Sequence, residues 1–273
     1  MEDLKSALQQ AIGHHRAGRL SEAELCCRNI LAHAPEQPDA LNHLGVLAAQ
    51  TGRSEEARGL LEKAVEQRPN DPWIHHNLGK ILAAEGEWAA AEASYRASLD
   101  LMPDNPEVRI GLGQVLTKAG RVEDAIAYYR DALKTAPDHA GLLVNLGSTL
   151  LQSRVFDEAE QALRHAIAAR ADYGLAHYNL GHLLKDRGRI AEAEEAYTAA
   201  LDLSHDVADT HMQLGECCQR LGRFEEGVEH YKKAIALNER LFLKILGKLT
   251  SVPQGRFSLK IGRLREDLSY LLH

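Results

Sequence analysis

Histidine and cysteine are the residues of this chain whose chemistry is most suggestive. The chain has 14 histidines and four cysteines in 273 residues, and both side chains are common zinc ligands. The cysteines form two adjacent pairs, Cys26-Cys27 and Cys217-Cys218. A metal site, a disulfide or an activated thiol would each require the fold to bring such groups together. The elements that position them must therefore be established first.

Short catalytic motifs are missing from the sequence. It contains no phosphate-binding loop, no Gly-x-Ser-x-Gly nucleophile motif and no Cys-x-x-Cys pair. Gly111-Leu112-Gly113 begins like a dinucleotide-binding motif, but the third glycine is absent and no strand is predicted before it. We therefore predict that the protein is not an enzyme and that it binds no cofactor.

A Leu-Gly dipeptide returns at a fixed interval and organises the chain. Successive copies are 34 residues apart, and six of them keep strict register: Leu44-Gly45, Leu78-Gly79, Leu112-Gly113, Leu146-Gly147, Leu180-Gly181 and Leu214-Gly215. A small residue follows each glycine at a constant distance: Ala57, Ala91, Ala125, Ala159, Ala193 and Gly227. Prolines close the first four periods at Pro35, Pro69, Pro103 and Pro137. Such a period indicates a repeat protein, in which each unit buries its apolar face on its neighbours.

This pattern resembles the tetratricopeptide repeat family, whose unit is a helix–turn–helix with small residues where the two helices touch. The resemblance covers about residues 4–241. It implies an all-α fold, an α-solenoid wound as a right-handed superhelix of about seven repeats. It also implies a binding scaffold rather than a particular activity, because this family has many unrelated partners.

The period divides residues 1–241 into repeats near 4–37, 38–71, 72–105, 106–139, 140–173, 174–207 and 208–241. Residues 242–273 follow as a C-terminal helical segment, with a turn at Pro253-Gln254-Gly255 and a last helix that Ser258 would cap. That last helix presents apolar residues at helical spacing, Ile261, Leu264, Leu268 and Leu271. This segment is interpreted as a cap on the last repeat. A surface for self-association or for a membrane, and a linker to a further domain, are the alternatives.

Repeats two to four open with a proline, which suits the first turn of a helix, at Pro38, Pro72 and Pro106. Between their two helices they place a glycine, which can take the left-handed conformation, at Gly52, Gly86 and Gly120.

The later repeats depart from this pattern. Arg154 replaces the turn glycine, and Gly227 replaces the small alanine. Ala171, His205 and Glu239 replace the closing proline. Because a glycine inside a helix costs about 0.5–1 kcal/mol relative to alanine, we expect repeats five to seven to exchange their amide hydrogens sooner than repeats two to four.

The repeat answers the opening question about histidine and cysteine. His75, His177 and His211 share one repeat position, and equivalent positions of adjacent repeats lie about 10 Å apart, too far to share an ion. The two cysteine pairs lie in the first and seventh repeats, where no disulfide can join them, and Cys27 and Cys218 fall on buried positions. No metal is expected, and a reducing cytoplasm is the simplest compartment.

Charge and hydropathy limit the classes of partner. The net charge is -7 and the repeats carry no basic stripe, so a nucleic-acid partner is not expected. No apolar run is long enough to span a bilayer, and the N-terminus has no signal-peptide pattern. Residues 242–273 are the exception, with six basic and two acidic side chains.

Candidate binding residues lie on the face of each first helix that, in the tetratricopeptide family, lines a concave groove. The fifth position carries an apolar row in repeats four to seven, at Ile110, Val144, Tyr178 and Met212. Such a row either marks an interaction surface or packs between helices or under the C-terminal segment. The same face adds His76 at the fifth position of repeat three, and it adds side chains at other positions: Trp73, Lys80, Gln114, Ser148 and His182.

Amide side chains recur at the sixth position, at Asn77, Asn145, Asn179 and Gln213. An amide both donates and accepts, so it can pair with a peptide backbone without reading its sequence. This row resembles the asparagine ladder in the repeat region of protein O-linked N-acetylglucosamine transferases, although His43 and Gly111 interrupt it. The Lys-x-x-x-Asn and Lys-x-x-x-Arg motifs of the chaperone-binding subgroup are absent from the first helices, so chaperone tails are not the expected ligand.

We therefore predict a non-enzymatic scaffold that binds a protein or an extended peptide in the concave groove. The alternative is the substrate-recognition region of a larger glycosyltransferase or sulfotransferase.

Overall fold

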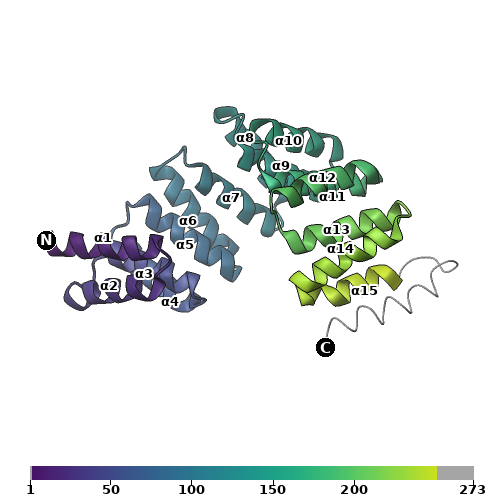
Figure 1. The fold of residues 1–273 in the computed structure, drawn as a ribbon. Helices are drawn as coiled ribbons and strands as arrows, with labels where there is room; N and C mark the ends of the chain where they lie inside the picture. The colour runs from purple at the N-terminus through teal and green to yellow at the C-terminus, as the bar shows by residue number, and fades with distance from the viewer. Residues whose placement is uncertain (1, 251–273) are drawn as a thin grey trace. The chain divides into compact units, whose positions relative to one another are not determined.

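The computed structural model describes the backbone of residues 2–250 and the side chains of residues 4–247. Within this range the chain forms fifteen α-helices and one short 3-10 helix, and it contains no strand (Figure 1). The all-α prediction is confirmed. The predicted last helix, with Ser258, Ile261, Leu264, Leu268 and Leu271, lies outside the described residues.

The helices follow one another in pairs, two to each 34-residue period, and the chain divides into two compact units, residues 1–132 and 133–273. We call them the N-terminal half and the C-terminal half. The N-terminal half contains α1 (Glu2–Arg16), α2 (Leu20–His33), α3 (Pro38–Gln50), α4 (Ser54–Gln67), α5 (Pro72–Glu85), α6 (Trp88–Leu101), α7 (Pro106–Lys118) and most of α8 (Val122–Thr135). The C-terminal half contains α9 (Ala140–Gln152), α10 (Phe156–Ala169), α11 (Gly174–Asp186), α12 (Ile190–Asp202), α13 (Val207–Arg220), α14 (Phe224–Leu237), the 3-10 helix η1 (Glu239–Leu241) and α15 (Phe242–Thr250).

The first helices of repeats two to four begin as the prolines predict. Pro38, Pro72 and Pro106 each occupy the first turn, where the missing N–H is not needed. The residue before each proline caps the helix; the Asp71 carboxylate, for example, accepts a hydrogen bond from the backbone N–H of Trp73 at 3.0 Å.

The turn between the two helices of a repeat requires a left-handed residue. Gly52, Gly86 and Gly120 adopt φ of 78°, 82° and 80° there, which confirms the assignment of these glycines. Arg154 keeps the same conformation with φ of 58°. A side chain in that region is strained by about 1–2 kcal/mol, so repeat five retains the turn at a cost that repeats two to four avoid.

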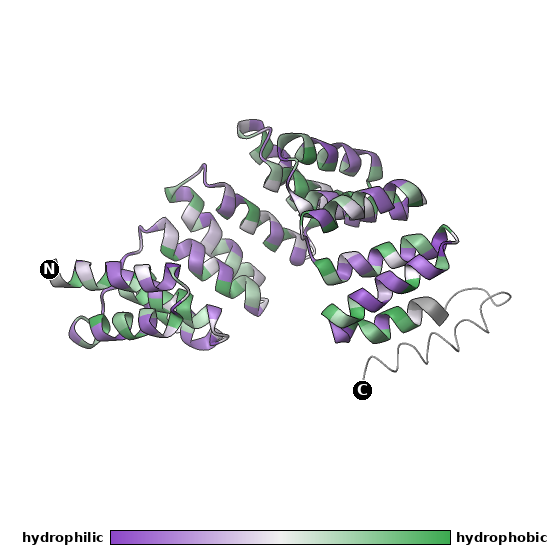
Figure 2. Cartoon of the chain, in the orientation of Figure 1, coloured by the Kyte–Doolittle hydropathy of each residue, from purple (hydrophilic) through white to green (hydrophobic). Residues whose placement is uncertain are grey.

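Hydrophilic and hydrophobic residues alternate along most helices in Figure 2, as expected where a helix buries one stripe and exposes another. The small alanines of the repeat are fully buried at the contact of the two helices, namely Ala57, Ala91, Ala125, Ala159 and Ala193. Gly227 is buried at the same position, and a Cβ built there would lie 2.9 Å from the carbonyl oxygen of Gly215. The helices of repeat seven thus approach too closely for alanine.

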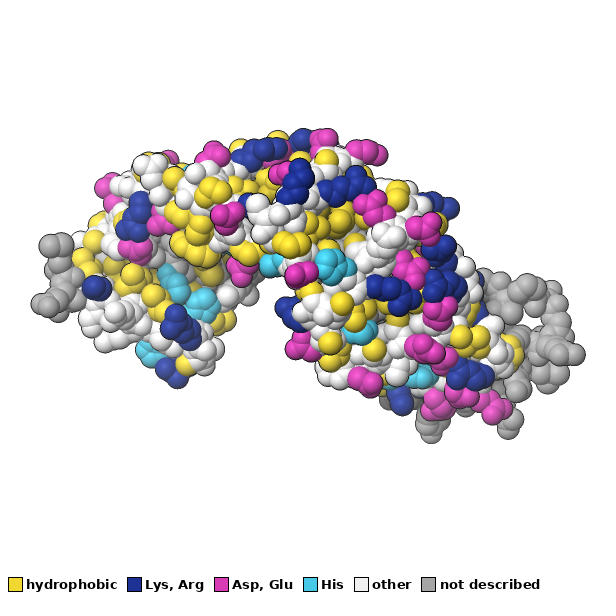
Figure 3. Space-filling view, turned by 90° about the horizontal axis from the view of Figure 1, so that it is seen from above, with side chains coloured by type: hydrophobic (Ala, Val, Ile, Leu, Met, Phe, Trp, Pro, Cys, Tyr) yellow, Lys and Arg dark blue, Asp and Glu magenta, His cyan; other side chains and the backbone are white. Residues whose placement is uncertain are grey.

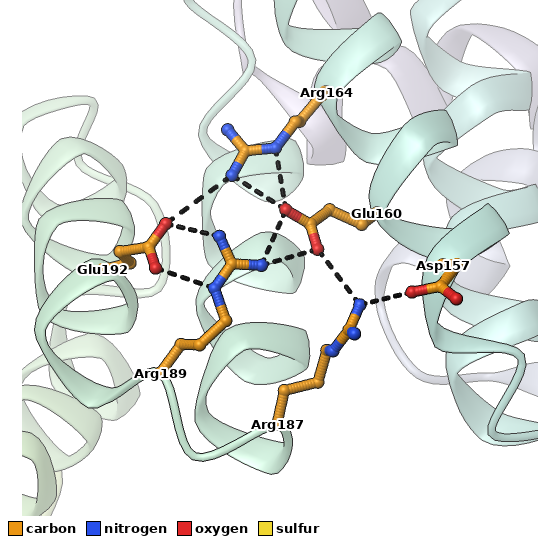
Figure 4. A network of polar contacts seen from close by, with 6 residues as sticks. All are labelled: Asp157, Glu160, Arg164, Arg187, Arg189 and Glu192. Atoms are coloured by element: carbon orange, nitrogen blue, oxygen red, sulfur yellow. Dashed lines mark hydrogen bonds and ion pairs between the residues drawn. The ribbon is translucent and has the colours of Figure 1, made fainter.

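Ion pairs join adjacent repeats along their second helices. In the N-terminal half Arg53 binds Glu24 of the preceding repeat at 2.6 Å. In the C-terminal half the corresponding pair, Arg189 and Glu160 at 2.8 Å, belongs to a wider network. Figure 4 shows its six members, drawn from α10, α12 and the turn between α11 and α12: Asp157, Glu160, Arg164, Arg187, Arg189 and Glu192. Burial raises the pKa of Glu160, but hydrogen bonds from Arg164 and Arg189 outweigh it and leave this pKa lowered.

The last described helix covers the end of repeat seven. Met212 of α13 is fully buried in a cluster with Tyr231 and Ile235 of α14, with Leu241 of η1 and with Ile245 of α15. For the described part of that segment, the capping interpretation therefore agrees with the packing.

Candidate functional site

The candidate site is the face of the first helices at the positions selected from the sequence. We call the residues from repeats two to four the N-terminal face: Asn42, Trp73, His76, Asn77, Lys80, Ile110, Gly111 and Gln114. Those from repeats five to seven form the C-terminal face: Val144, Asn145, Ser148, Tyr178, Asn179, His182, Met212 and Gln213. Each face lies within one half of the molecule.

An exposed tryptophan dominates the N-terminal face. Trp73, in the first turn of α5, is 49% exposed. Its ring meets that of His76 edge-on at 6.1 Å between centroids, and His76 in turn lies 5.9 Å from Tyr95 of α6. Burial, and next the charge of Lys80, lower the pKa of His76, so this histidine is neutral near pH 7 and extends the apolar surface beneath the tryptophan.

Two amides meet beside this aromatic group. Asn77 donates from Nδ2 to Oδ1 of Asn42 on the preceding repeat at 2.9 Å. The bond fixes both side-chain planes, and the Asn42 amide nitrogen and the Asn77 amide oxygen take no part in it. A peptide bond offers the complementary acceptor and donor. Asn42 had not been placed in the predicted set of binding residues; its signal is an amide on the preceding first helix.

The remaining predicted residues of this face are accessible to different degrees. Lys80 and Gln114 are exposed, and Ile110 on α7 is half-buried. The row of amides at the sixth position is interrupted in repeat two by His43. The centroid of the His43 ring lies 5.0 Å from that of His15, and burial lowers the pKa of His43.

On the C-terminal face, amide side chains donate hydrogen bonds to other groups of the same half. Asn179 donates to the hydroxyl of Ser148 on the preceding repeat at 2.7 Å, and Asn145 donates to the carbonyl of Gly141 at 2.8 Å. These amides lie on the predicted face, but the bonds to their neighbours occupy donors that a peptide would otherwise use.

The carboxylate of Asp209 on α13 links side chains of α11, α13 and α15. Asp209 accepts hydrogen bonds from the hydroxyl of Tyr178 and from Nε2 of Gln213, the latter at 3.0 Å, and it lies 3.3 Å from Nζ of Lys244 on α15. Burial raises its pKa, but these partners outweigh burial and leave it lowered. Lys185 adds a bond to Gln213 at 2.6 Å. Neither Asp209 nor Lys185 was in the predicted set.

The four residues of the apolar row, Ile110, Val144, Tyr178 and Met212, differ in how deeply they are buried. Val144 is 1% exposed and Met212 is fully buried, so both pack inside the protein and present nothing to a partner. For Met212 the reason is the cover of α15; for Val144 it is that α9 is apolar around most of its circumference. Tyr178 is half-buried between His182 and His205, with ring centroids 4.7 and 5.3 Å away. Ile110 alone lies on the more open N-terminal face.

Histidine and cysteine contribute no reactive site among the described side chains. The cysteines are unpaired thiols, with Cys27 and Cys218 buried as predicted and Cys217 buried as well. Burial raises the pKa of Cys27 to about 12, which keeps it a thiol rather than a nucleophilic thiolate. Within residues 4–247 no three His, Cys, Asp or Glu side chains converge in a geometry that would hold a metal ion.

Charged side chains of both signs are interspersed over the surface seen in Figure 3. Among residues 2–250, every helix is too short or too polar to cross a bilayer.

Paired helices in a 34-residue period define a helical-repeat protein, built by stacking one supersecondary unit. The family follows from direct matches: a tetratricopeptide repeat model matches residues 8–72, 76–140 and 178–240, and a second such model matches residues 116–181. The chain belongs to the tetratricopeptide repeat family. Such repeats generally mediate protein–protein interaction, and most proteins built from them are non-enzymatic scaffolds.

Solved structures agree with this assignment. A tetratricopeptide repeat protein from Parabacteroides merdae has a TM-score of 0.74 at 16% identity, over 91% of this chain and 99% of its own. The MamA protein has a TM-score of 0.51 at 25% identity, over 62% of this chain and 93% of its own. YrrB, described as a repeat protein with an unusual peptide-binding site, has a TM-score of 0.50 at 18% identity, over 71% and 97%. No curated protein sequence matches the chain significantly.

Proposed function

We propose that this protein is a non-enzymatic scaffold that binds an extended peptide segment of a partner on its N-terminal face. The observation that carries the proposal is the Asn42–Asn77 pair beside the exposed ring of Trp73. The pair offers backbone-like hydrogen bonding in a fixed orientation, and the tryptophan offers an apolar contact. YrrB, a protein of similar fold, is described as having a peptide-binding site.

The two contributions depend on each other. A hydrogen bond exchanged with water is worth only about 0.5–1.5 kcal/mol, so amides alone would bind a peptide weakly. Burial of an aromatic side chain adds about 25 cal/mol per Å², and interface energy concentrates in such residues. The C-terminal face differs, because Asn179 bonds to a hydroxyl and Asn145 to a main-chain carbonyl instead of to a second amide. Its apolar residues Met212 and Val144 are buried.

The proposal is tested with a display library of random linear peptides, selected on the full chain. Selected peptides should bind Trp73→Ala and Asn77→Ala at least about tenfold more weakly than the parent, with helical circular dichroism unchanged. Asn179→Ala is the matched control, because it removes the same side chain at the same repeat position on the C-terminal face. No selected peptide, or peptides that bind all three variants like the parent, would refute the assignment of this face.

A further inference from the structure

The row of amides has a gap on the N-terminal face, and a tyrosine lies beneath it. Repeat four carries Gly111 at the sixth position, and this glycine is half-buried, so solvent reaches its backbone. A Cβ built on Gly111 would lie 2.7 Å from Cζ of Tyr95 and 2.9 Å from its hydroxyl oxygen. Any side chain at this position would collide with the end of the tyrosine ring and cover its hydroxyl.

The Tyr95 hydroxyl differs from those of the three tyrosines at the same position of other repeats. Tyr129 donates to the carbonyl of Ile110 at 3.4 Å, and Tyr231 donates to Gln219 at 2.9 Å. The hydroxyl of Tyr197 is fully enclosed without a partner. Within residues 4–247 the Tyr95 hydroxyl has no hydrogen bond and is not among the enclosed atoms. Of the four, it is the one available to an external group.

The surroundings of this hydroxyl determine which group it suits. Tyr95 is only 3% exposed, and burial raises its pKa to about 12, so the phenol stays neutral and can donate a hydrogen bond at physiological pH. Its ring continues the aromatic group formed with His76 and Trp73. A neutral donor in an apolar setting suits an uncharged acceptor, because an ion placed there would lose much of its hydration.

We propose that the Tyr95 hydroxyl, reached at Gly111, donates a hydrogen bond to a main-chain carbonyl of the bound peptide. The proposal rests on the peptide-binding function proposed above and deepens it. The Asn42–Asn77 pair, carried by α3 and α5, and the Tyr95 hydroxyl beneath α7 then hold an extended main chain at two places. Trp73 of α5 and Ile110 of α7, the residue directly before the gap, contact an apolar side chain of the same peptide. The partner is thus an uncharged, extended segment containing a large apolar residue.

The test uses one peptide selected on the parent from the random library. Tyr95→Phe removes only the hydroxyl, so it should weaken binding of that peptide by about two- to tenfold and leave the melting temperature unchanged. Tyr129→Phe is the matched control: it removes a hydroxyl that has an internal partner, so it should lower the melting temperature and leave affinity unchanged.

A second measurement tests whether the Tyr95 hydroxyl donates a hydrogen bond to a main-chain carbonyl of the peptide. Each peptide bond of the selected peptide is replaced in turn by an ester, whose carbonyl accepts hydrogen bonds less well. One ester should weaken binding to the parent but not to Tyr95→Phe, which is the coupling expected of a direct pair.

The outcomes separate the two proposals. If binding depends on Trp73 and Asn77 while Tyr95→Phe binds like the parent, the hydroxyl has no role and peptide binding stands. If no ester is coupled to Tyr95, the main-chain assignment is wrong. If binding depends on neither Trp73 nor Asn77, the proposed function itself fails.

Discussion

Residues at the same repeat position differ in burial between the N-terminal half and the C-terminal half. At the fifth position Ile110 is half-buried on the N-terminal face, whereas Met212 is fully buried in the C-terminal half. At the sixth position Asn77 pairs with another amide, whereas Gln213 belongs to a network around Asp209 and Lys185. Repetition of sequence therefore specifies the position of a side chain in its repeat but not its exposure, which the neighbouring element decides.

The strongest test of this comparison truncates the fifth position in each half. Met212→Ala should lower the free energy of unfolding by about 2–5 kcal/mol, because it leaves a cavity under α15 that the cluster cannot fill. Ile110→Ala should cost only about 1 kcal/mol, since this side chain is only partly buried in the parent. Chemical denaturation of both variants measures the difference. Equal losses would show that the two positions are equally buried in solution.

Acidification should affect the C-terminal half through His182. Burial, followed by the charge of Lys185, lowers the pKa of His182 to about 4. Because the folded value lies below the unfolded value, the stabilisation is complete above pH 6.5 and is lost as the pH falls from about 6.5 toward 4. His211 and His230 of repeat seven also have lowered pKa values and add to the same trend.

The measurement is the melting temperature between pH 7 and pH 5. His182→Phe preserves an aromatic ring beside Tyr178 and Tyr197 but cannot be protonated, so its melting temperature should depend less on pH than that of the parent. His33→Phe, which removes a histidine from the exposed end of α2, is the control. An unaltered slope in His182→Phe would assign the pH dependence to other groups.

The smallest expected effect concerns the turn of repeat five. Arg154→Gly should raise the free energy of unfolding by about 1 kcal/mol, because glycine adopts φ of 58° without the strain of a side chain. The substitution gives repeat five the turn residue that repeats two to four already have. Arg154→Ala retains a Cβ in the left-handed region and should give no such gain; if it stabilises the protein equally, loss of the arginine side chain is the cause.

Much of the fold could be predicted from the sequence because the same residue pattern recurs in successive repeats. The period located the helix pairs, the prolines located the starts of α3, α5 and α7, and Gly52, Gly86 and Gly120 located the turns. These signals are local: each depends on a conformational preference of one residue or on the contact between two adjacent helices. Such local signals can be recognised without knowing how the rest of the chain folds.

The candidate site could be predicted only in part, since it depends on contacts between repeats. The first-helix pattern identified Trp73 and Asn77, but not that Asn42 would orient the latter amide. It identified Met212 but left open whether the C-terminal segment would cover it, because the sequence of that segment lies outside the period. Tyr95, whose role is proposed above, is not in the predicted set because its access depends on the absence of a side chain at Gly111, whereas a pattern search counts side chains that are present.

The register of α15 bears on how a protein of this kind changes in length. This helix begins at Phe242, 34 residues after Ala208, which opens the last repeat. It therefore takes the place along the chain where the first helix of an eighth repeat would begin. Its buried residue Ile245 packs on repeat seven, in the cluster with Met212, Tyr231 and Ile235. Duplication of one complete repeat ahead of the cap would present the same contact surface, so repeat number can vary by whole periods while the terminal helix is inherited unchanged.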